Sequence, residues 1–143
     1  MEAGTYSILL ELPRETRIEF GAAGERVLDA GWYAYTGSAF GPGGLSRVER
    51  HRRVARGEND TRHWHVDYLL GAAPSRWDGV WTTTRDAECM VAGQLPGEAI
   101  QGIGATDCDC ASHLQYTPDR ASMVQALDRR YGPQSKVSHS EGR

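Results

Sequence analysis

Four side chains in the N-terminal half of the chain are of the types that enzymes use on phosphate esters. Tyr6 and Tyr35 each belong to a tripeptide that joins tyrosine to threonine and glycine, and Arg47 and His51 follow four residues apart. Phosphodiester hydrolysis needs a base for water and positive charge beside the phosphoryl oxygens. Arginine supplies that charge, and tyrosine serves as a base where neighbouring positive charge favours its phenolate. These residues indicate a phosphate-handling site; core tyrosines and a solvated arginine are the alternative.

The segment after Tyr35 is basic and is predicted to form a helix. Ser46 and Glu49 have the spacing of a capping box, which would place Arg47 in the first turn, where backbone N–H groups favour an anion. Arginines neutralise phosphates, and an indole ring stacks on bases. A solvated basic helix face is the alternative. The candidates for contact with nucleic acid in and after this segment are Arg50, Arg52, Arg53 and Trp64.

The elements that must position these residues are short strands joined by hairpin-like turns, interrupted by amphipathic helices. Strands are predicted at 5–12, 17–20, 25–28, 31–37, 79–84 and 113–116, and helices after residue 46, at 85–95 and at 119–131. The segment 63–70 fits either a strand or a helix. This order predicts an α+β fold with a small antiparallel sheet. We expect one domain over residues 1–132 and a polar, disordered tail over 133–143.

The composition is that of an ordinary globular domain. The chain has 143 residues, of which 39% are hydrophobic, enough for one core. The formal net charge of −3 gives no overall attraction to nucleic acid, although a local basic patch still can. Three cysteines cannot form a complete set of internal disulfides, which favours a reducing cytoplasm. No signal-peptide pattern is visible, and the longest apolar stretch is too short to span a bilayer, so we expect a cytoplasmic protein without a membrane partner.

Two short patterns and four longer segments resemble the GIY-YIG nuclease superfamily. Gly4-Thr5-Tyr6 and Tyr35-Thr36-Gly37 are similar to its paired tripeptides, with threonine in place of each middle isoleucine. A stand-alone branch, the Uri-superfamily endonucleases, is marked by a Tyr-x-Tyr-x-Gly-Ser-Ala strand, an Arg-x-x-Arg-His helix, a Trp-His-x-Asp-Tyr-Leu segment and an Asp-Cys-x-Cys-x-Ser-His-Leu turn. The chain has these patterns at 33–39, 47–51, 64–69 and 107–114. The resemblance covers residues 4–131.

The resemblance implies a GIY-YIG-like fold, with a three-stranded antiparallel core sheet flanked by helices and an extra N-terminal hairpin between the tripeptides. It implies a metal-dependent endonuclease that acts on nucleic acid, DNA in preference to RNA, without a covalent intermediate. Either tyrosine would act as the base, directly or with the histidine, while the arginine holds the phosphate and a glutamate holds Mg²⁺ or Mn²⁺. The implied catalytic residues are Tyr6, Tyr35, Arg47 and His51, and the implied metal ligand is Glu88.

Two other functions stay open at this point. One is a non-catalytic module that binds nucleic acid on the same fold. The other is a zinc-dependent hydrolase built from His63, His65 and Asp67, which would share one face if their segment were a strand. Alternatively, His65 and Asp67 form a buried hydrogen-bonded pair, or they line the nuclease cleft and touch phosphate or the catalytic tyrosine.

A cysteine-containing turn and a third tyrosine complete the candidates. Cys108, Cys110 and His113 would hold a structural zinc ion if Cys89 or Asp107 supplied a fourth ligand, whereas buried cysteines also serve as small hydrophobic residues. Tyr33 lies two residues before the catalytic candidate of its strand and therefore shares its face. It is the tyrosine most easily confused with the base.

Overall fold

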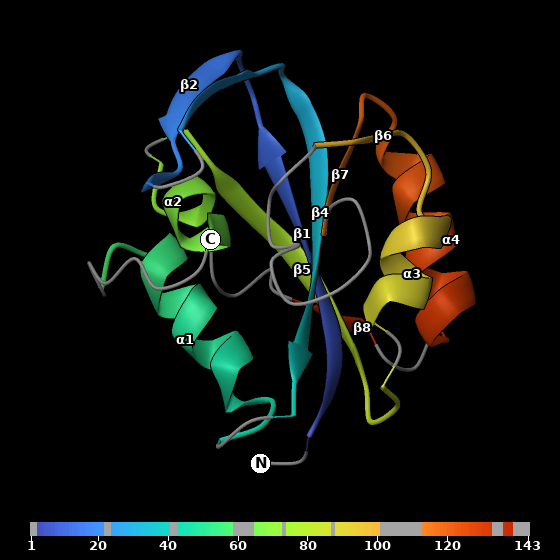
Figure 1. The fold of residues 1–143 in the computed structure, drawn as a ribbon. Coiled ribbons are helices and arrows are strands. Elements are labelled where there is room, and N and C mark those ends of the chain that lie inside the picture. The colour runs from blue at the N-terminus through green and yellow to red at the C-terminus, as the bar shows by residue number, and fades with distance from the viewer. Residues whose placement is uncertain are drawn as a thin grey trace.

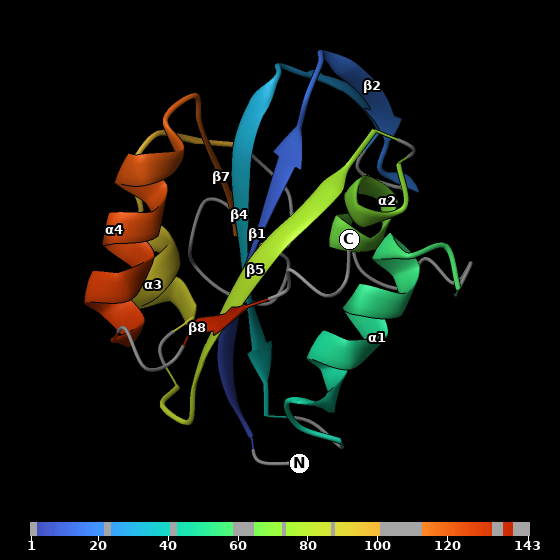
Figure 2. The ribbon, with the colours of Figure 1, turned by 180° about the vertical axis from the view of Figure 1, so that it is seen from behind.

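The computed structural model describes residues 3–21, 24–40, 43–58, 65–72, 74–86, 88–100, 113–132 and 136–138. In these ranges an antiparallel sheet lies between two layers of helices (Figures 1 and 2). Its strands follow the order β6-β7-β4-β1-β5-β8. The bounds are β6 Glu98–Ala99, β7 Leu114–Thr117, β4 Gly31–Ala39, β1 Gly4–Leu12, β5 Arg76–Thr83 and β8 Lys136–Ser138.

Strand β1 is the centre of the fold. It pairs antiparallel with β4 on one side, where Tyr6 lies opposite Gly37, and with β5 on the other, where Tyr6 lies opposite Thr82. Eight of its nine residues are buried, because helices cover both of its faces. The register with β5 shifts between Leu9 and Leu10.

The helices divide between the two faces of the sheet. Helices α1 (Ser46–Ala55) and α2 (His65–Leu70) cover one face, and α3 (Glu88–Gln94) and α4 (Arg120–Tyr131) cover the other (Figures 1 and 2). Alternate residues of β1 therefore enter different cores. Ile8 and Leu10 pack with α1 and α2, whereas Leu9 packs with α3 and α4. We call these layers the α1/α2 face and the α3/α4 face.

The predicted hairpin is present. Strands β2 (Thr16–Glu19) and β3 (Glu25–Leu28) pair with each other in a separate two-stranded sheet. The α+β class and the antiparallel sheet are confirmed, and the sheet is larger than a three-stranded core. Five strands from β6 to β5 form most of it, and the short β8 joins at the edge of β5. That strand lies inside the segment 133–143, whose other residues lie outside the described ranges.

One local expectation is wrong, and one open choice between strand and helix is decided. Ser46 does not cap α1: Leu45 is the N-cap residue and makes no side-chain capping bond, while the Ser46 hydroxyl donates to the carbonyl oxygen of Gly43 at 2.6 Å. Residues 65–70 form the helix α2, so the alternation of side chains expected for a strand does not apply to His65 and Asp67. Asp119 caps α4, since its carboxylate accepts from the backbone N–H of Ala121.

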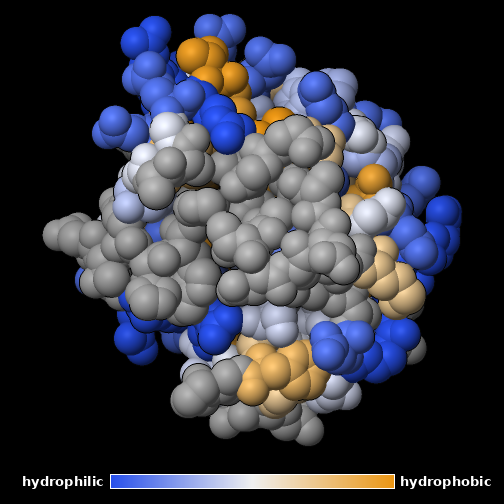
Figure 3. Space-filling view, in the orientation of Figure 1, coloured by the Kyte–Doolittle hydropathy of each residue, from blue (hydrophilic) through white to orange (hydrophobic). Residues whose placement is uncertain are grey.

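Exposed hydrophobic side chains are scattered. The large ones among the described residues are Val27, Phe40 and Met90. Figure 3 shows hydrophobic surface at the end of the molecule that holds the β2–β3 hairpin and a second spot near the opposite end. Isolated spots of this kind are normal for a protein surface. No helix in the described ranges is long and apolar enough to cross a membrane.

Candidate functional site

Both glycines of the paired tripeptides have a packing role. A Cβ atom on Gly37 would lie 2.5 Å from the hydroxyl oxygen of Tyr6, and one on Gly4 would lie 2.1 Å from the carbonyl oxygen of Thr83. Neither glycine has a positive φ, so close approach rather than backbone conformation requires them. Gly37 leaves space for the Tyr6 ring, and Gly4 lets β1 and β5 approach each other. The residues that suggested a functional motif are thus also packing requirements.

A chain of three hydrogen-bonding side chains begins at Tyr6. Its hydroxyl lies 2.8 Å from Nε2 of His51, and Nδ1 of His51 lies 3.0 Å from Oδ1 of Asp67. Both separations are those of hydrogen bonds. Tyr6 is 1% exposed, and His51 and Asp67 are 0% exposed. We call this chain the Tyr6–His51–Asp67 network, and it lies wholly inside the α1/α2 core.

Three different elements supply the members of the network. Tyr6 points from β1 to the α1/α2 face, and His51 lies on the buried side of α1, where Val48 and Val54 also pack. Asp67 lies in the first turn of α2. The backbone N–H groups at the N-terminus of a helix favour negative charge there. The network therefore ties the central strand to both helices of this face.

Tyr35 and His113 lie beside the network. The Tyr35 ring centroid is 6.4 Å from that of Tyr6, 6.3 Å from that of His51 and 6.4 Å from that of His113. The carbonyl oxygen of His113 accepts from the backbone N–H of Thr36 at 2.9 Å, which fixes its position. Burial lowers the pKa of the His113 imidazole from its ordinary value. His113 thus packs on a candidate catalytic tyrosine, while Cys108 and Cys110, its partners in the predicted zinc site, lie outside the described residues.

Tyr33 is separated from this chemistry. Its hydroxyl donates to the carbonyl oxygen of Asp29 at 2.7 Å, and its ring packs on Tyr116 with centroids 4.9 Å apart. Burial, and then the charges of Tyr116, Asp29 and Glu98, raise the pKa of the Tyr33 phenol. The Tyr33 hydroxyl therefore has its hydrogen-bond partner outside the Tyr6–His51–Asp67 network.

Arg47 lies in the first turn of α1 and is half-buried. Its Nη1 donates to the carbonyl oxygen of Ser38 at 2.5 Å, near the end of β4. This bond holds the guanidinium at the end of the strand that carries Tyr35. The sequence-predicted arginine and tyrosines are therefore brought to one side of the sheet.

Glu88 is the first residue of α3, which packs on the α3/α4 face through Val91 (Figures 1 and 2). The placement of its side chain lies outside the described structure. Among the described residues, no group of three His, Cys, Asp or Glu side chains could hold a metal ion. A single carboxylate that holds Mg²⁺ through water and phosphate needs no such group, so the role of Glu88 stays a prediction.

The arginines predicted to contact nucleic acid differ in how far they are exposed. Arg53 is exposed, and Arg50 is half-buried. Arg52 lies 3.4 Å from Glu49, with its guanidinium 5.6 Å from the centre of the Trp77 ring, so part of its surface packs on the protein. Trp64 and His63 lie outside the described residues, as does the side chain of His65.

A second buried polar cluster, on the α3/α4 face, was not predicted. The Ser7 hydroxyl lies 2.7 Å from the Thr36 hydroxyl and 2.7 Å from the Tyr131 hydroxyl. Ser7 and Thr36 directly follow the two tripeptide tyrosines in sequence. Small hydroxyl residues inside apolar strands were the available signal, since buried hydroxyls require partners. This cluster fixes α4 against β1 and β4.

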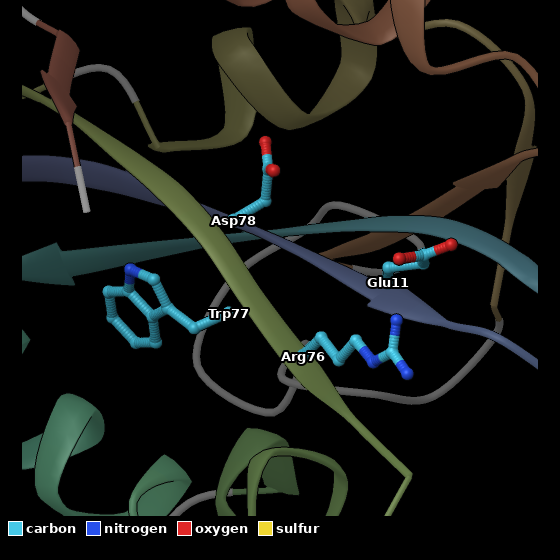
Figure 4. A pocket seen from close by; sticks show the side chains of 4 residues that line it. All are labelled: Glu11, Arg76, Trp77 and Asp78. Carbon is cyan, nitrogen blue, oxygen red and sulfur yellow. The ribbon is translucent and has the colours of Figure 1, made fainter. Parts of the chain in front are cut away.

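The described pockets lie away from the network. One of about 170 Å³ is lined by Glu11, Arg76, Trp77 and Asp78, with Trp77 and Asp78 on opposite sides of β5 (Figure 4). It lies at the far end of β5 from the residue that pairs with Tyr6. A second, of about 330 Å³, lies between β3 and the strands β6 and β7, and Tyr33 and Tyr116 line it. Neither pocket contains a predicted catalytic residue.

The fold and the site define an α+β domain with paired strand tyrosines and a buried tyrosine–histidine–aspartate network. Residues 5–133 match the family described as domain of unknown function DUF123. Because this match covers most of the chain, the protein belongs to that family. No curated protein and no solved structure shows a significant match to the chain.

Proposed function

We propose that this protein is an endonuclease that hydrolyses phosphodiester bonds of nucleic acid, on a fold that resembles the GIY-YIG domain. The observation that carries the proposal is the 2.8 Å contact between the Tyr6 hydroxyl and Nε2 of His51. The two residues come from the tripeptide and the helix that resemble the superfamily, and they are 45 residues apart in sequence. This contact supports the resemblance independently, because the resemblance rests on sequence patterns alone.

In this proposal Tyr6 is the general base and His51 accepts its proton. A phenol acts as a base after it loses its proton, and an imidazole within hydrogen-bond reach is a suitable acceptor. The phenolate of Tyr6 then takes a proton from water as the water oxygen attacks phosphorus. Tyr35 lies beside both groups and would help shape the space around the phosphate.

Arg47 is proposed to neutralise the phosphoryl oxygens. Its bond to the carbonyl oxygen of Ser38 orients the guanidinium at the end of β4. A guanidinium stays charged at all relevant pH values and presents a planar set of donors to phosphate. Preorganised charge at a position where negative charge develops is among the larger contributions to catalysis.

Dependence on Mg²⁺ or Mn²⁺ is part of the proposal on the strength of the resemblance alone. The side chain of the implied ligand, Glu88, lies outside the described structure, so no step is assigned to the ion. The preference for DNA over RNA has the same basis, whereas the proposed cytoplasmic location rests on the odd number of cysteines. Exposed Arg53 and the neighbouring Arg50 would contact the nucleic-acid backbone, which would make binding weaken as salt increases.

A non-catalytic nucleic-acid-binding module is the second candidate, and one observation favours it. Tyr6, His51 and Asp67 are at most 1% exposed, as expected for a purely structural network. The nuclease proposal therefore requires that the bound nucleic acid gain access to the Tyr6 hydroxyl. A zinc hydrolase built from His63, His65 and Asp67 is disfavoured, because α2 is a helix and Asp67 bonds to His51.

Cleavage assays separate the candidates. Branched, nicked and single-stranded DNA and single-stranded RNA are incubated with the protein in Mg²⁺, in Mn²⁺ and in chelator. We expect wild type to cleave at least one of them, and Arg47→Ala to lower the rate about 10²–10³-fold. Arg85→Ala is the matched control, since the Arg85 guanidinium donates to the carbonyl oxygen of Arg130 in α4.

Two outcomes contradict the nuclease. Equal cleavage by wild type and Arg47→Ala would remove the assigned role of the arginine. Salt-sensitive binding in gel shifts without cleavage of any substrate would favour the non-catalytic module.

A further inference from the structure

We propose that Asp67 is a positioning residue of this site, which holds His51 in the tautomer whose unprotonated Nε2 accepts the Tyr6 proton. The catalytic meaning of this inference rests on the proposed nuclease function, whereas the tautomer is a property of the protein alone. Oδ1 of Asp67 is 3.0 Å from Nδ1 of His51, and the opposite ring nitrogen is 2.8 Å from the Tyr6 hydroxyl. Asp67 therefore acts on Tyr6 through the imidazole.

The two distances define how protons are arranged. A neutral imidazole has one N–H and one bare nitrogen. If Nδ1–H donates to the Asp67 carboxylate, Nε2 is bare and accepts from the Tyr6 O–H, so both contacts are complete. The reverse arrangement requires a protonated Asp67 that donates to Nδ1, and it leaves Tyr6 as the acceptor from Nε2–H.

The surroundings of Asp67 favour the first arrangement. An aspartate is ordinarily ionised at neutral pH. Burial opposes the charge, but a donated N–H and a place in the first turn of a helix both favour it. Asp67 lies in the first turn of α2, and its Oδ1 is 3.0 Å from Nδ1 of His51, within reach of a donated N–H. The same carboxylate would stabilise His51 when it becomes positively charged.

The reaction needs only water and protons exchanged with solvent. The Tyr6 proton moves to Nε2, which gives a phenolate and an imidazolium that faces the Asp67 carboxylate. The phenolate takes a proton from water, the water oxygen forms a bond to phosphorus, and the bond from phosphorus to the leaving oxygen breaks with its electron pair. The leaving oxygen takes a proton from solvent, and His51 returns its extra proton to solvent.

The burial of the network explains why one carboxylate can set the tautomer. Tyr6, His51 and Asp67 come from β1, α1 and α2, and none is more than 1% exposed. Water does not compete for either ring nitrogen in this state. A merely structural role would require only that the three side chains fill their space, whereas the proposed role requires a defined proton position.

The tautomer is measured directly on the full chain. Nitrogen-15 spectra with two-bond proton couplings distinguish protonated from unprotonated imidazole nitrogens, and the His51 signals are identified by their loss in His51→Gln. At neutral pH we expect Nδ1 of His51 to carry the proton and Nε2 to be bare. This measurement needs neither a substrate nor a variant of Asp67.

Asp67→Asn then tests the consequence. The carboxamide can donate an N–H to Nδ1, so we expect the tautomer to reverse and kcat to fall about 10²–10⁴-fold, with a much smaller change in KM. In Ser-His-Asp triads the same substitution lowers kcat by about 10⁴ through the wrong tautomer. Asp78→Asn is the matched control, because Asp78 pairs with Arg120 outside the network.

The outcomes separate the inference from the function it rests on. A wild-type His51 with its proton on Nε2 overturns the inference, and so does Asp67→Asn that cleaves within about twofold of wild type. The expected tautomer in a wild type that cleaves no substrate instead refutes the nuclease proposal, and with it any catalytic role for Asp67. If Asp67→Asn does not fold, the wild-type spectrum decides.

Discussion

Replacement of Gly37 by alanine tests whether the tripeptide glycine exists to admit the Tyr6 ring. The new Cβ would lie 2.5 Å from the Tyr6 hydroxyl oxygen and 2.6 Å from Cζ of the same ring. Ordinary contact begins at 3.4 Å, so the ring must move by nearly 1 Å. Gly37 has no positive φ, so the backbone accepts alanine and the steric contact is isolated.

The magnitude follows from the packing. Overfilling a core costs about 1–3 kcal/mol, and loss of the Tyr6–His51 hydrogen bond costs about 1 kcal/mol more. We therefore expect Gly37→Ala to lower the free energy of unfolding by about 2–4 kcal/mol in urea titrations followed by circular dichroism. Gly93→Ala is the control, because a Cβ on Gly93 meets nothing within 4 Å in α3. It should stabilise by up to about 1 kcal/mol.

One result would refute this reasoning. If Gly37→Ala unfolds within about 0.5 kcal/mol of wild type, the space around the Tyr6 ring is not the constraint that the structure indicates. The same variant should also weaken cleavage, because a displaced hydroxyl no longer reaches Nε2 of His51.

Three further predictions concern polar side chains. Ser7→Ala should cost about 1–2 kcal/mol of unfolding free energy in the same titrations, because the buried Tyr131 hydroxyl loses a partner, and an unchanged midpoint would contradict this. Because the pKa of His113 is lowered in the folded state, its contribution to stability is present above the pKa of the unfolded state and is lost as pH falls below that pKa. An NMR titration midpoint of His113 at or above the pKa of a free histidine would contradict this. Hydrogen bonds from Ser122 and the first turn of α4 lower the pKa of Asp119, so its contribution is present above the unfolded pKa and is lost as pH falls through the folded one. Melting temperatures of wild type and Asp119→Ala should therefore converge in acid.

Local patterns predicted most of the elements. Strand β3 was predicted at 25–28 and lies at Glu25–Leu28, and the helix predicted at 119–131 is α4 with its aspartate cap. Alternation and capping act over a few residues, so they can be read from sequence. The predicted helix at 85–95 is shorter in the structure, where α3 covers Glu88–Gln94. Helix ends are set by tertiary contacts that a local pattern does not contain.

The hydrogen bonds within the site join residues that are far apart in the sequence. Tyr6 and His51 could be named from the tripeptides and the basic helix, but the partner of Asp67 could not. The sequence left Asp67 at a zinc site with His63 and His65, in a buried pair with His65, or in the nuclease cleft. The helix α2 instead turns Asp67 toward α1 and His51. The face on which α3 packs was hidden for the same reason, because the crossover after β5 is decided by sheet order and not by the sequence of the helix.

Consecutive residues of β1 anchor opposite layers of the molecule. The Tyr6 hydroxyl bonds to α1, and the Ser7 hydroxyl bonds to α4. A slip of β1 by one residue would turn both side chains to the wrong layer and break both anchors at once. The register of the central strand is thus fixed by two side chains. The Tyr6 phenol and the Ser7 hydroxyl both reach their partners in only one position of the sheet between its helices.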